Sequence, residues 1–197
     1  MLTDGQRDHT GGAEQILRRL AVERVLDPRI ARESPYKRRA VAVAVERRIP
    51  VSEARAGASW RLGGLTIRVL WPDGPGLPSE DPNQRTVVLL ASYGEVDALL
   101  SADAETDVTA RLLAQHVEIL KVAHHGSEDP GLAAELSELR PLVAVISCGR
   151  GNSYGHPRPE TLAALGAVPG LRLHRTDRDG RVVVESDGKR VWIRSDR

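Results

Sequence analysis

The sequence carries side chains that could bind a metal ion, placed in loops beside predicted strands and helices. Four of its six histidines, His9, His124, His125 and His156, lie in or beside polar loops that follow predicted strands or begin helices. Loops at strand ends are where a rigid scaffold displays reactive groups. Asp8 precedes His9, so a carboxylate and an imidazole could turn toward one cation, although Asp8 could equally cap a helix.

The other candidate residues occupy comparable positions. Asp103 follows the predicted strand 96–100, where it either starts a helix or bridges two metal ions about 3.5–4 Å apart. His124 and His125 end a predicted buried strand, a place that apolar side chains would fill without any polar group to satisfy. His156 follows the next strand and precedes a helix. The joint placement of these residues on one rim is the main sequence argument for a metal site.

The elements that must position these residues follow from apolar periodicity. Helices are predicted from residue 13 and over 35–48, 105–115, 131–139 and 157–165. Strands are predicted at 25–26, twice within 60–71, and at 86–92, 96–100, 118–123 and 142–148. A closing meander of strands is predicted at 171–174, 181–185 and 190–194, with turns at Asp179-Gly180 and Asp187-Gly188. Residues 3–12 and 74–82 read as loops. Alternating strands and helices flanked by hairpins predict a layered α/β domain.

Bulk properties narrow the classes of function. At 197 residues, the chain fits a single domain spanning 1–197. A net charge of +1 provides no global field for nucleic acid, so any contact with a polyanion would be local. Cys148 is the only cysteine, which excludes a disulfide framework and a cysteine-type zinc site. We expect neither a secretion signal nor a membrane anchor within this sequence.

The same residues carry a resemblance to a known family. Leu2-Thr3 with Asp8 to Gly12 resembles the signature loop of metallo-β-lactamase-fold hydrolases, and Ser101-Ala102-Asp103 resembles the motif that supplies their bridging carboxylate. Residues 121–127 and 152–157 resemble the HHGS and YGHP segments of the C-terminal domain of the ComEC family. The resemblance runs from residue 2 to about residue 185.

The resemblance implies a metallo-β-lactamase-like αββα sandwich with one or two divalent ions, Zn²⁺ or Mn²⁺, in a cleft between two sheets. It also implies that Asp8 and His9 hold one metal, that Asp103 bridges, and that His156 closes the same metal site. His124 or His125 would be a further ligand or the proton donor to the leaving oxygen, with His125 favoured as the acid. The catalytic residues expected from the resemblance are Asp8 and His125.

Two departures from the family pattern affect the expected site. The family has histidine where this chain has Asp4, and histidine or aspartate where it has Gln6. Asp4 could still ligate a hard cation, whereas Gln6 is a poor neutral ligand. The family also has strands before the signature loop, so we expect the first strands of the sandwich to be lacking, which would expose a sheet edge to a partner.

Three functions are therefore compared. The leading one is a metal-dependent phosphodiesterase or nuclease linked to DNA uptake, with DNA, expected to be single-stranded, as substrate. The alternative is a non-catalytic remnant or accessory interaction module of the same fold. A hydrolase of small esters or nucleotides is the third. A membrane channel, or the lacking strands, is the expected partner. The compartment is left open: the chain is cytoplasmic by default, while ComEC relatives are membrane-associated.

Overall fold

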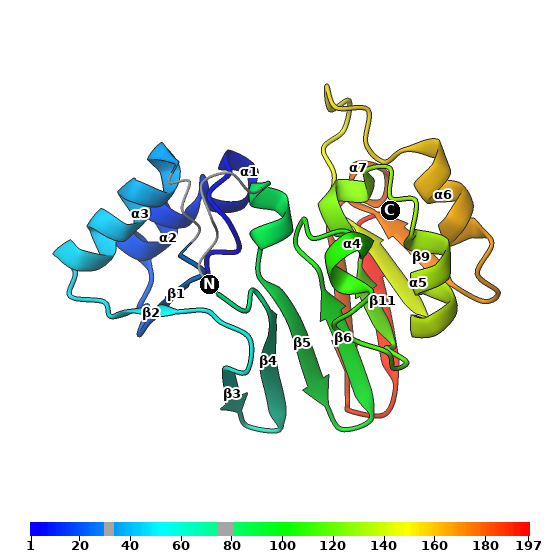
Figure 1. Ribbon diagram of the computed structural model, residues 1–197, viewed down its shortest axis with the longest axis horizontal. Coiled ribbons are helices and arrows are strands. Elements are labelled where there is room, and N and C mark those ends of the chain that lie inside the picture. The colour runs from blue at the N-terminus through cyan, green and yellow to red at the C-terminus, as the bar shows by residue number, and fades with distance from the viewer. Residues whose placement is uncertain (30–33, 75–80) are drawn as a thin grey trace.

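The protein is built around one large mixed sheet, described by a computed structural model that covers residues 1–29, 34–74 and 81–197. The sheet has seven strands in the order β3-β4-β5-β6-β7-β8-β9 (Figure 1). Their bounds are β3 Ser59–Leu62, β4 Leu65–Trp71, β5 Val88–Tyr93, β6 Val96–Leu100, β7 Ile119–Lys121, β8 Val143–Ile146 and β9 Arg172–Arg175. The predicted layered α/β class is confirmed. Most of the loop predicted at 74–82 lies outside the described residues.

The sheet changes from antiparallel to parallel at β6. Strands β3 to β6 pair antiparallel through consecutive hairpins, while β7, β8 and β9 each pair parallel with the preceding strand. The carboxyl ends of β6, β7 and β8 therefore lie at the same edge of the sheet. Ligand sites of open α/β sheets form at this kind of edge. The loops that leave it carry Asp103, the His124-His125 pair and His156.

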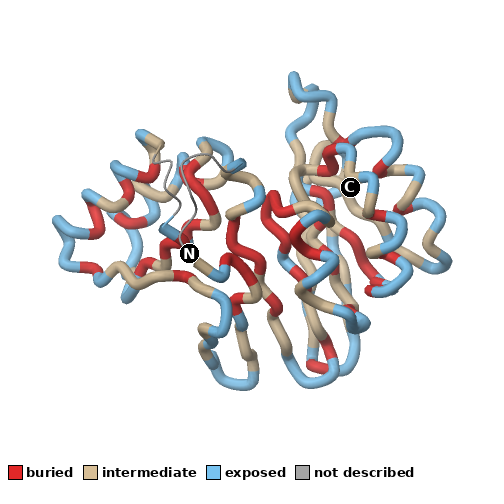
Figure 2. The backbone as a smooth tube through the Cα atoms, viewed as in Figure 1, coloured by how far each residue is buried: buried red, intermediate tan, exposed pale blue. Residues whose placement is uncertain are grey.

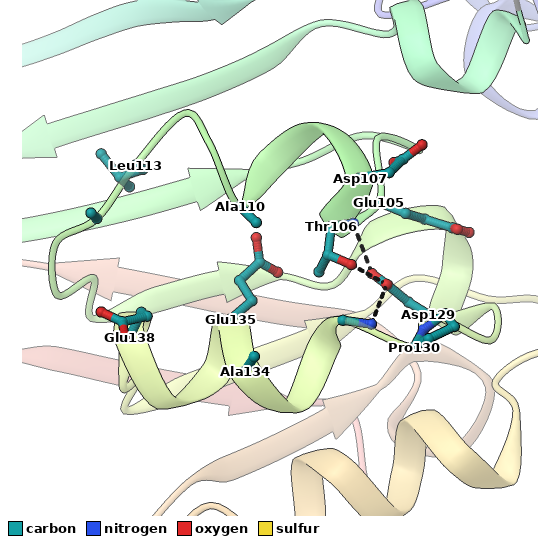
Figure 3. A pocket seen from close by; sticks show the side chains of 12 residues that line it. Glu105, Thr106, Asp107, Ala110, Leu113, Asp129, Pro130, Ala134, Glu135 and Glu138 are labelled. Carbon is teal, nitrogen blue, oxygen red and sulfur yellow. Dashed lines mark hydrogen bonds between the residues drawn. The ribbon is translucent and has the colours of Figure 1, made fainter.

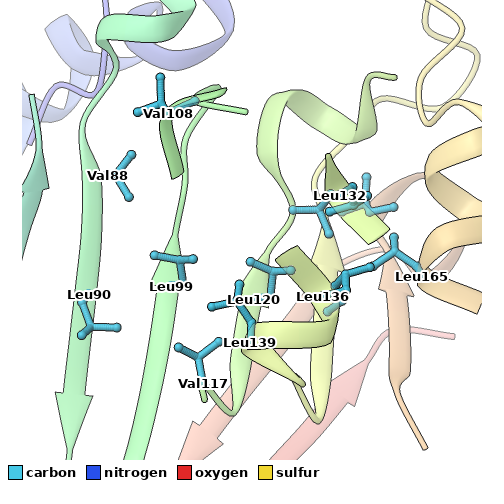
Figure 4. Packing of buried hydrophobic residues seen from close by; sticks show 14 of the residues in the cluster. Val88, Leu90, Leu99, Val108, Val117, Leu120, Leu132, Leu136, Leu139 and Leu165 are labelled. Atoms are coloured by element: carbon cyan, nitrogen blue, oxygen red, sulfur yellow. The ribbon is translucent and has the colours of Figure 1, made fainter. Parts of the chain in front are cut away.

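One face of the sheet is covered by helices, and the core lies beneath them. These helices are α4 Thr106–Thr109, α5 Leu132–Leu139 and α6 Pro159–Gly166. Strand residues Leu99 and Leu120 meet Leu136 of α5 in the main hydrophobic cluster (Figure 4). Buried backbone follows the central strands, whereas the hairpin turns at the far end are exposed (Figure 2).

A short two-stranded sheet, formed by β10 Val182–Ser186 and β11 Val191–Ser195, lies on the other face of the large sheet (Figure 1). The turn of this hairpin meets the turn between β5 and β6, where the Glu95 amide donates to the Gly188 carbonyl at 2.6 Å. A Cβ atom at Gly94 would lie 2.4 Å from that carbonyl oxygen, so the close approach requires glycine.

The amino-terminal elements form a separate layer beside β4 and β5. They are α1 Arg7–Thr10, α2 Ala13–Arg19, β1 Val25–Asp27, α3 Pro35–Glu46 and β2 Val51–Glu53. The Val87 amide donates to the Thr3 carbonyl at 2.9 Å, which attaches the segment before α1 to the chain entering β5. Lys37 and Asp27 form an ion pair of 2.8 Å, and Lys37 is buried. These contacts hold α1, and with it Asp8 and His9, near the carboxyl edge of the sheet.

Several local predictions are corrected by tertiary contacts. The predicted loop 3–12 contains α1, and the predicted helix 105–115 is helical only at α4. The predicted meander is wrong at its first turn, because β9 joins the large sheet and is followed by the short helix α7 Thr176–Asp179. Thr176 exchanges two hydrogen bonds with the backbone of Cys148, both 2.9 Å, which ties α7 to the end of β8. Strand β2 was not predicted.

The packing of β6 leads to a stability prediction for two adjacent leucines. Leu99 is 1% exposed and Leu100 is 37% exposed. We expect Leu99→Ala to lower the free energy of unfolding by about 2–5 kcal/mol, because it leaves a cavity in the core. Leu100→Ala, the matched control, should cost about 1 kcal/mol or less. Urea unfolding measures both, and equal losses would contradict the assigned core face.

Candidate metal centre

The imidazole of His9 lies at the centre of the candidate site. Its Nε2 atom is 3.0 Å from Asp103 Oδ2, 3.2 Å from His125 Nε2 and 3.9 Å from Asp8 Oδ2. On the opposite side of the ring, Nδ1 is 2.9 Å from Asp4 Oδ2. Residues from the amino-terminal layer and from two strand-end loops therefore converge, as the sequence predicted for Asp8, His9 and Asp103.

The described residues contain two groups of potential ligands that share His9. They are Asp8, His9 and His125, and Asp4, His9 and Asp103, with the ligand atoms of each group within 4.8 Å of one another. Groups that combine carboxylate oxygens with imidazole nitrogens suit Zn²⁺ or Mn²⁺. Asp103 Oδ1 is buried without a hydrogen-bond partner, which is costly for a carboxylate oxygen and fits a cation ligand. The side chains thus fit a divalent metal.

The loops that bring these groups together adopt unfavourable backbone angles. Ala102, His124 and His125 have φ values of 49°, 44° and 55°, in the left-handed region that side chains other than glycine rarely enter. Each such residue costs about 1–3 kcal/mol when the surroundings enforce it. The Ala102 carbonyl accepts from Lys121 Nζ at 2.8 Å and from the His124 amide at 3.0 Å. Lys121 therefore joins the two loops beneath the site.

The charges of the site set the protonation of His9. Burial would lower the pKa of His9, but hydrogen bonds and charge interactions with Asp103 and Asp4 outweigh it and raise the pKa to about 10. Burial would raise the pKa of Asp103, but the hydrogen bond and charge of His9 lower it overall. With no metal bound, His9 is therefore a cation between two carboxylates at neutral pH.

The adjacent histidines His124 and His125 face different partners. His125 Nδ1 lies 2.7 Å from the Ser147 carbonyl oxygen, which can only accept, so this nitrogen carries a proton and donates. His125 Nε2 faces His9 and Asp8, the latter at 3.2 Å. His124 Nδ1 lies 2.7 Å from Glu105 Oε1, and this hydrogen bond raises the pKa of His124.

From the sequence, His156 was expected to close the metal site. It belongs to neither ligand group of the described residues, and its ring centroid is 5.7 Å from that of His124. Burial, followed by the charge of His124, lowers the pKa of His156. The side-chain amide of Gln6 donates to Asn83 Oδ1.

A cavity of about 290 Å³ opens beside the cluster. Its lining joins candidate site residues to the loop after β8: Asp8, His125, Ser147, Cys148, Gly149, Asn152, Tyr154 and His156. His156 thus shares a cavity with Asp8 and His125. A reacting group could enter here and reach the imidazole of His125.

A larger cavity, about 770 Å³, lies between α4 and α5 (Figure 3). Its side chains include several carboxylates and no basic group: Glu105, Asp107, Asp129, Glu135 and Glu138. Asp129 accepts from the Thr106 and Gly131 amides at 3.0 and 3.2 Å, and Thr109 donates to Glu135. Two of these acids therefore hold the helices together, and no histidine lines this cavity, so the candidate chemistry lies at His9.

Two positioning residues escaped the sequence analysis. Glu105 orients His124, and Lys121 joins the loops of Asp103 and His124. A lysine within an otherwise apolar strand was a usable signal, because a buried ammonium needs a partner. Nothing local distinguished Glu105 from other acidic residues at a helix start.

Comparison with known proteins fits this geometry. No protein-family model matches the chain. ComE operon protein 3 of Bacillus subtilis is 28% identical over 92% of this chain and 24% of its own length. Recombination protein 2 of Haemophilus influenzae is 30% identical over 84% of this chain and 19% of its own length. Competence protein ComA of Neisseria gonorrhoeae is 28% identical over 61% of this chain and 18% of its own length.

A solved structure of a CmlA beta-hydroxylase E377D mutant matches with a TM-score of 0.55 at 15% identity, over 88% of this chain and 42% of that one. The fold is therefore that of the metallo-β-lactamase class. The chain is a homologue of the ComEC family of competence proteins, and it spans about a quarter or less of the length of these curated relatives. Within the described residues, no helix is both long and apolar enough to span a membrane.

The electrostatics predict opposite protonation states for two histidines of one sample. In chelator at pH 8, His9 should be cationic, because its pKa is raised to about 10, and it should lose its proton only as the pH rises through that value. His156 should be neutral at pH 8, because its pKa is lowered. Nitrogen-15 NMR of the imidazoles measures both, and a neutral His9 at pH 8 would contradict the assigned contacts with Asp4 and Asp103.

Proposed function

We propose that this chain is a metal-dependent phosphodiesterase that cleaves DNA, in a protein connected with DNA uptake. The observation that carries the proposal is the convergence of Asp8, His9 and Asp103 on His125, with one Asp103 oxygen buried and without a hydrogen-bond partner. The printed name of one relative concerns competence and that of another concerns recombination, which supports DNA as the substrate. A membrane channel is the partner we propose for the whole protein.

The ligand set we propose differs from the sequence expectation in the use of the histidines. His125 Nε2 carries no proton when the ring is neutral, because Nδ1 donates to Ser147. It faces Asp8 and His9, so we assign His125 as a ligand rather than as the acid. Asp4 accepts from His9 Nδ1 and thereby directs His9 Nε2 toward Asp103.

His124 is the proton donor in this proposal. Glu105 binds its Nδ1 and raises its pKa, which keeps the ring cationic nearer to neutral pH than a free imidazole. Ser127 donates to the same oxygen, Glu105 Oε1, so this oxygen has two partners. A bound divalent cation would activate a water and counter the charge that develops on the phosphate oxygens. His124 would then protonate the leaving oxygen.

Metal content and cleavage test the proposal together. We expect the purified chain to retain Zn²⁺ or Mn²⁺ and to cleave DNA when loaded, because the buried oxygens of the site need a cation. Asp103→Ala should lose the metal and the activity, whereas Glu138→Ala, an exposed acid of the neighbouring cavity, should lose neither. Elemental analysis and gel assays with single- and double-stranded DNA measure these outcomes, with circular dichroism as the folding control.

Cleavage of small phosphodiesters or nucleotides without DNA cleavage would replace DNA as the substrate class. A chain that binds no metal and has the same stability in chelator would refute the hydrolase outright.

The second candidate function is an accessory module with one structural metal. Gln6 favours it, because a neutral amide is a poor ligand and its side chain donates to Asn83 Oδ1, which leaves one ligand fewer for a second ion. A stoichiometry of one metal per chain, stability lost in chelator and no hydrolysis of any ester would support this module over the hydrolase.

The orienting role of Asp4 has its own test. Asp4→Asn keeps the shape but removes the charge that accepts from His9 Nδ1. We expect metal affinity to fall about 10- to 100-fold, the usual cost of losing a partner of a metal-bound histidine. Competition with a chelating dye measures the affinity, and Asp97→Asn, which removes an aspartate charge at the opposite end of β6, is the control. Unchanged affinity in Asp4→Asn would contradict the orienting role.

A further inference from the structure

The loop between β8 and α6, residues 149–158, extends beyond the carboxyl edge of the sheet (Figure 1). We call it the rim loop. Asn152 fixes its shape: Nδ2 donates to the Gly149 carbonyl at 3.0 Å and to the His156 carbonyl at 2.6 Å, and Oδ1 accepts from the His156 amide at 3.0 Å. The side chain at the tip of the loop is therefore presented by a preorganised backbone.

Tyr154 lies in this tip, and packing does not explain its position. It is 73% exposed, the largest value among the exposed large hydrophobic side chains of the described residues. Its ring lies 7° from parallel to that of His156, with centroids 6.0 Å apart, which is an offset stack. Both rings line the cavity that Asp8 and His125 share. An aromatic face thus stands open beside the candidate metal centre.

The loop that carries this aromatic face also carries two arginines. Arg150 and Arg158 lie in the rim loop and are exposed, and among the described residues neither forms an ion pair with a carboxylate. Arg150 Nε donates only to the backbone carbonyl of Asp177, at 3.3 Å. Guanidinium groups bind phosphate oxygens in a fork geometry. A chain of alternating bases and phosphates would meet both kinds of group here.

We propose that Tyr154 is a stacking platform for one unpaired nucleobase, and that Arg150 and Arg158 bind the neighbouring phosphates. The inference rests on the proposed function and names its substrate as single-stranded polynucleotide. A base within a duplex is already stacked on both sides, whereas an unpaired base has a face free for an aromatic side chain. The platform places the next phosphodiester toward Asp8 and His125.

The experiment compares two strands and four proteins, the original chain and three variants. Fluorescence anisotropy in chelator, where no cleavage occurs, measures binding of a thymidine decamer and of a decamer with the same phosphates but no bases. Tyr154→Ala should weaken binding of the thymidine strand between about fivefold and a hundredfold, and Tyr154→Phe should bind like the original chain. Neither change should alter binding of the base-free strand. Arg158→Ala should weaken both strands alike and reduce the salt dependence.

The outcomes separate this inference from the proposed function. A loaded chain that cleaves DNA but binds both strands equally, or that is indifferent to Tyr154→Ala, refutes the platform alone. A chain that prefers the thymidine strand through Tyr154, yet hydrolyses no ester with any metal, supports the platform and refutes the hydrolase. A chain that binds neither strand, with or without metal, refutes both. Preference for a duplex of equal length also overturns the platform.

Discussion

The structure depends on the placement of two buried carboxylates on either side of one imidazole. Asp4 and Asp103 are 0% and 1% exposed, and each lies within hydrogen-bond distance of His9. Two carboxylates in a dry site repel each other and lose their hydration, so a positive charge must accompany them. With no metal, the proton on His9 provides that charge. A divalent cation would provide a larger positive charge than the proton. The same electrostatic requirement would therefore favour metal binding and keep the two carboxylates in place.

The packing of the sheet keeps these charged residues together. The parallel strands β6, β7 and β8 place their carboxyl ends at one edge, and the core beneath them fixes that edge. The backbone is strained at Ala102, His124 and His125, which lie at this edge. Hydrogen bonds such as that of the His124 amide to the Ala102 carbonyl keep these residues from adopting more favourable backbone angles. Lys121 contributes in a second way, because its ammonium lies beneath the acidic cluster and stabilises Asp103 in its charged form.

The sequence predicted most of what depends on local pattern. The strand-end positions of Asp103 and of the His124-His125 pair could be predicted from the apolar runs that precede them, whereas Asp8 and His9, predicted in a loop, lie in helix α1. The interior position of Asp4 could not be predicted, because it depends on the Thr3 backbone pairing with the chain at Val87. The helix predicted at 105–115 failed for a related reason: intrinsic helix preference is weak, and only α4 stays helical in the tertiary context.

Two histidines follow each other at the end of β7. In the proposed function they have different tasks, because His124 would donate a proton and His125 would bind the metal. The left-handed backbone at both positions turns their rings to different partners, Glu105 for His124 and the Ser147 carbonyl for His125. A carboxylate partner stabilises the imidazolium, whereas a carbonyl partner selects the neutral tautomer that leaves Nε2 free. A catalytic pair needs this separation, since a charged ring cannot ligate a metal and a neutral ring cannot donate to a leaving oxygen in the same way. Under the proposed roles of His124 and His125, the backbone strain would be the structural cost of keeping an acid and a ligand within one dipeptide.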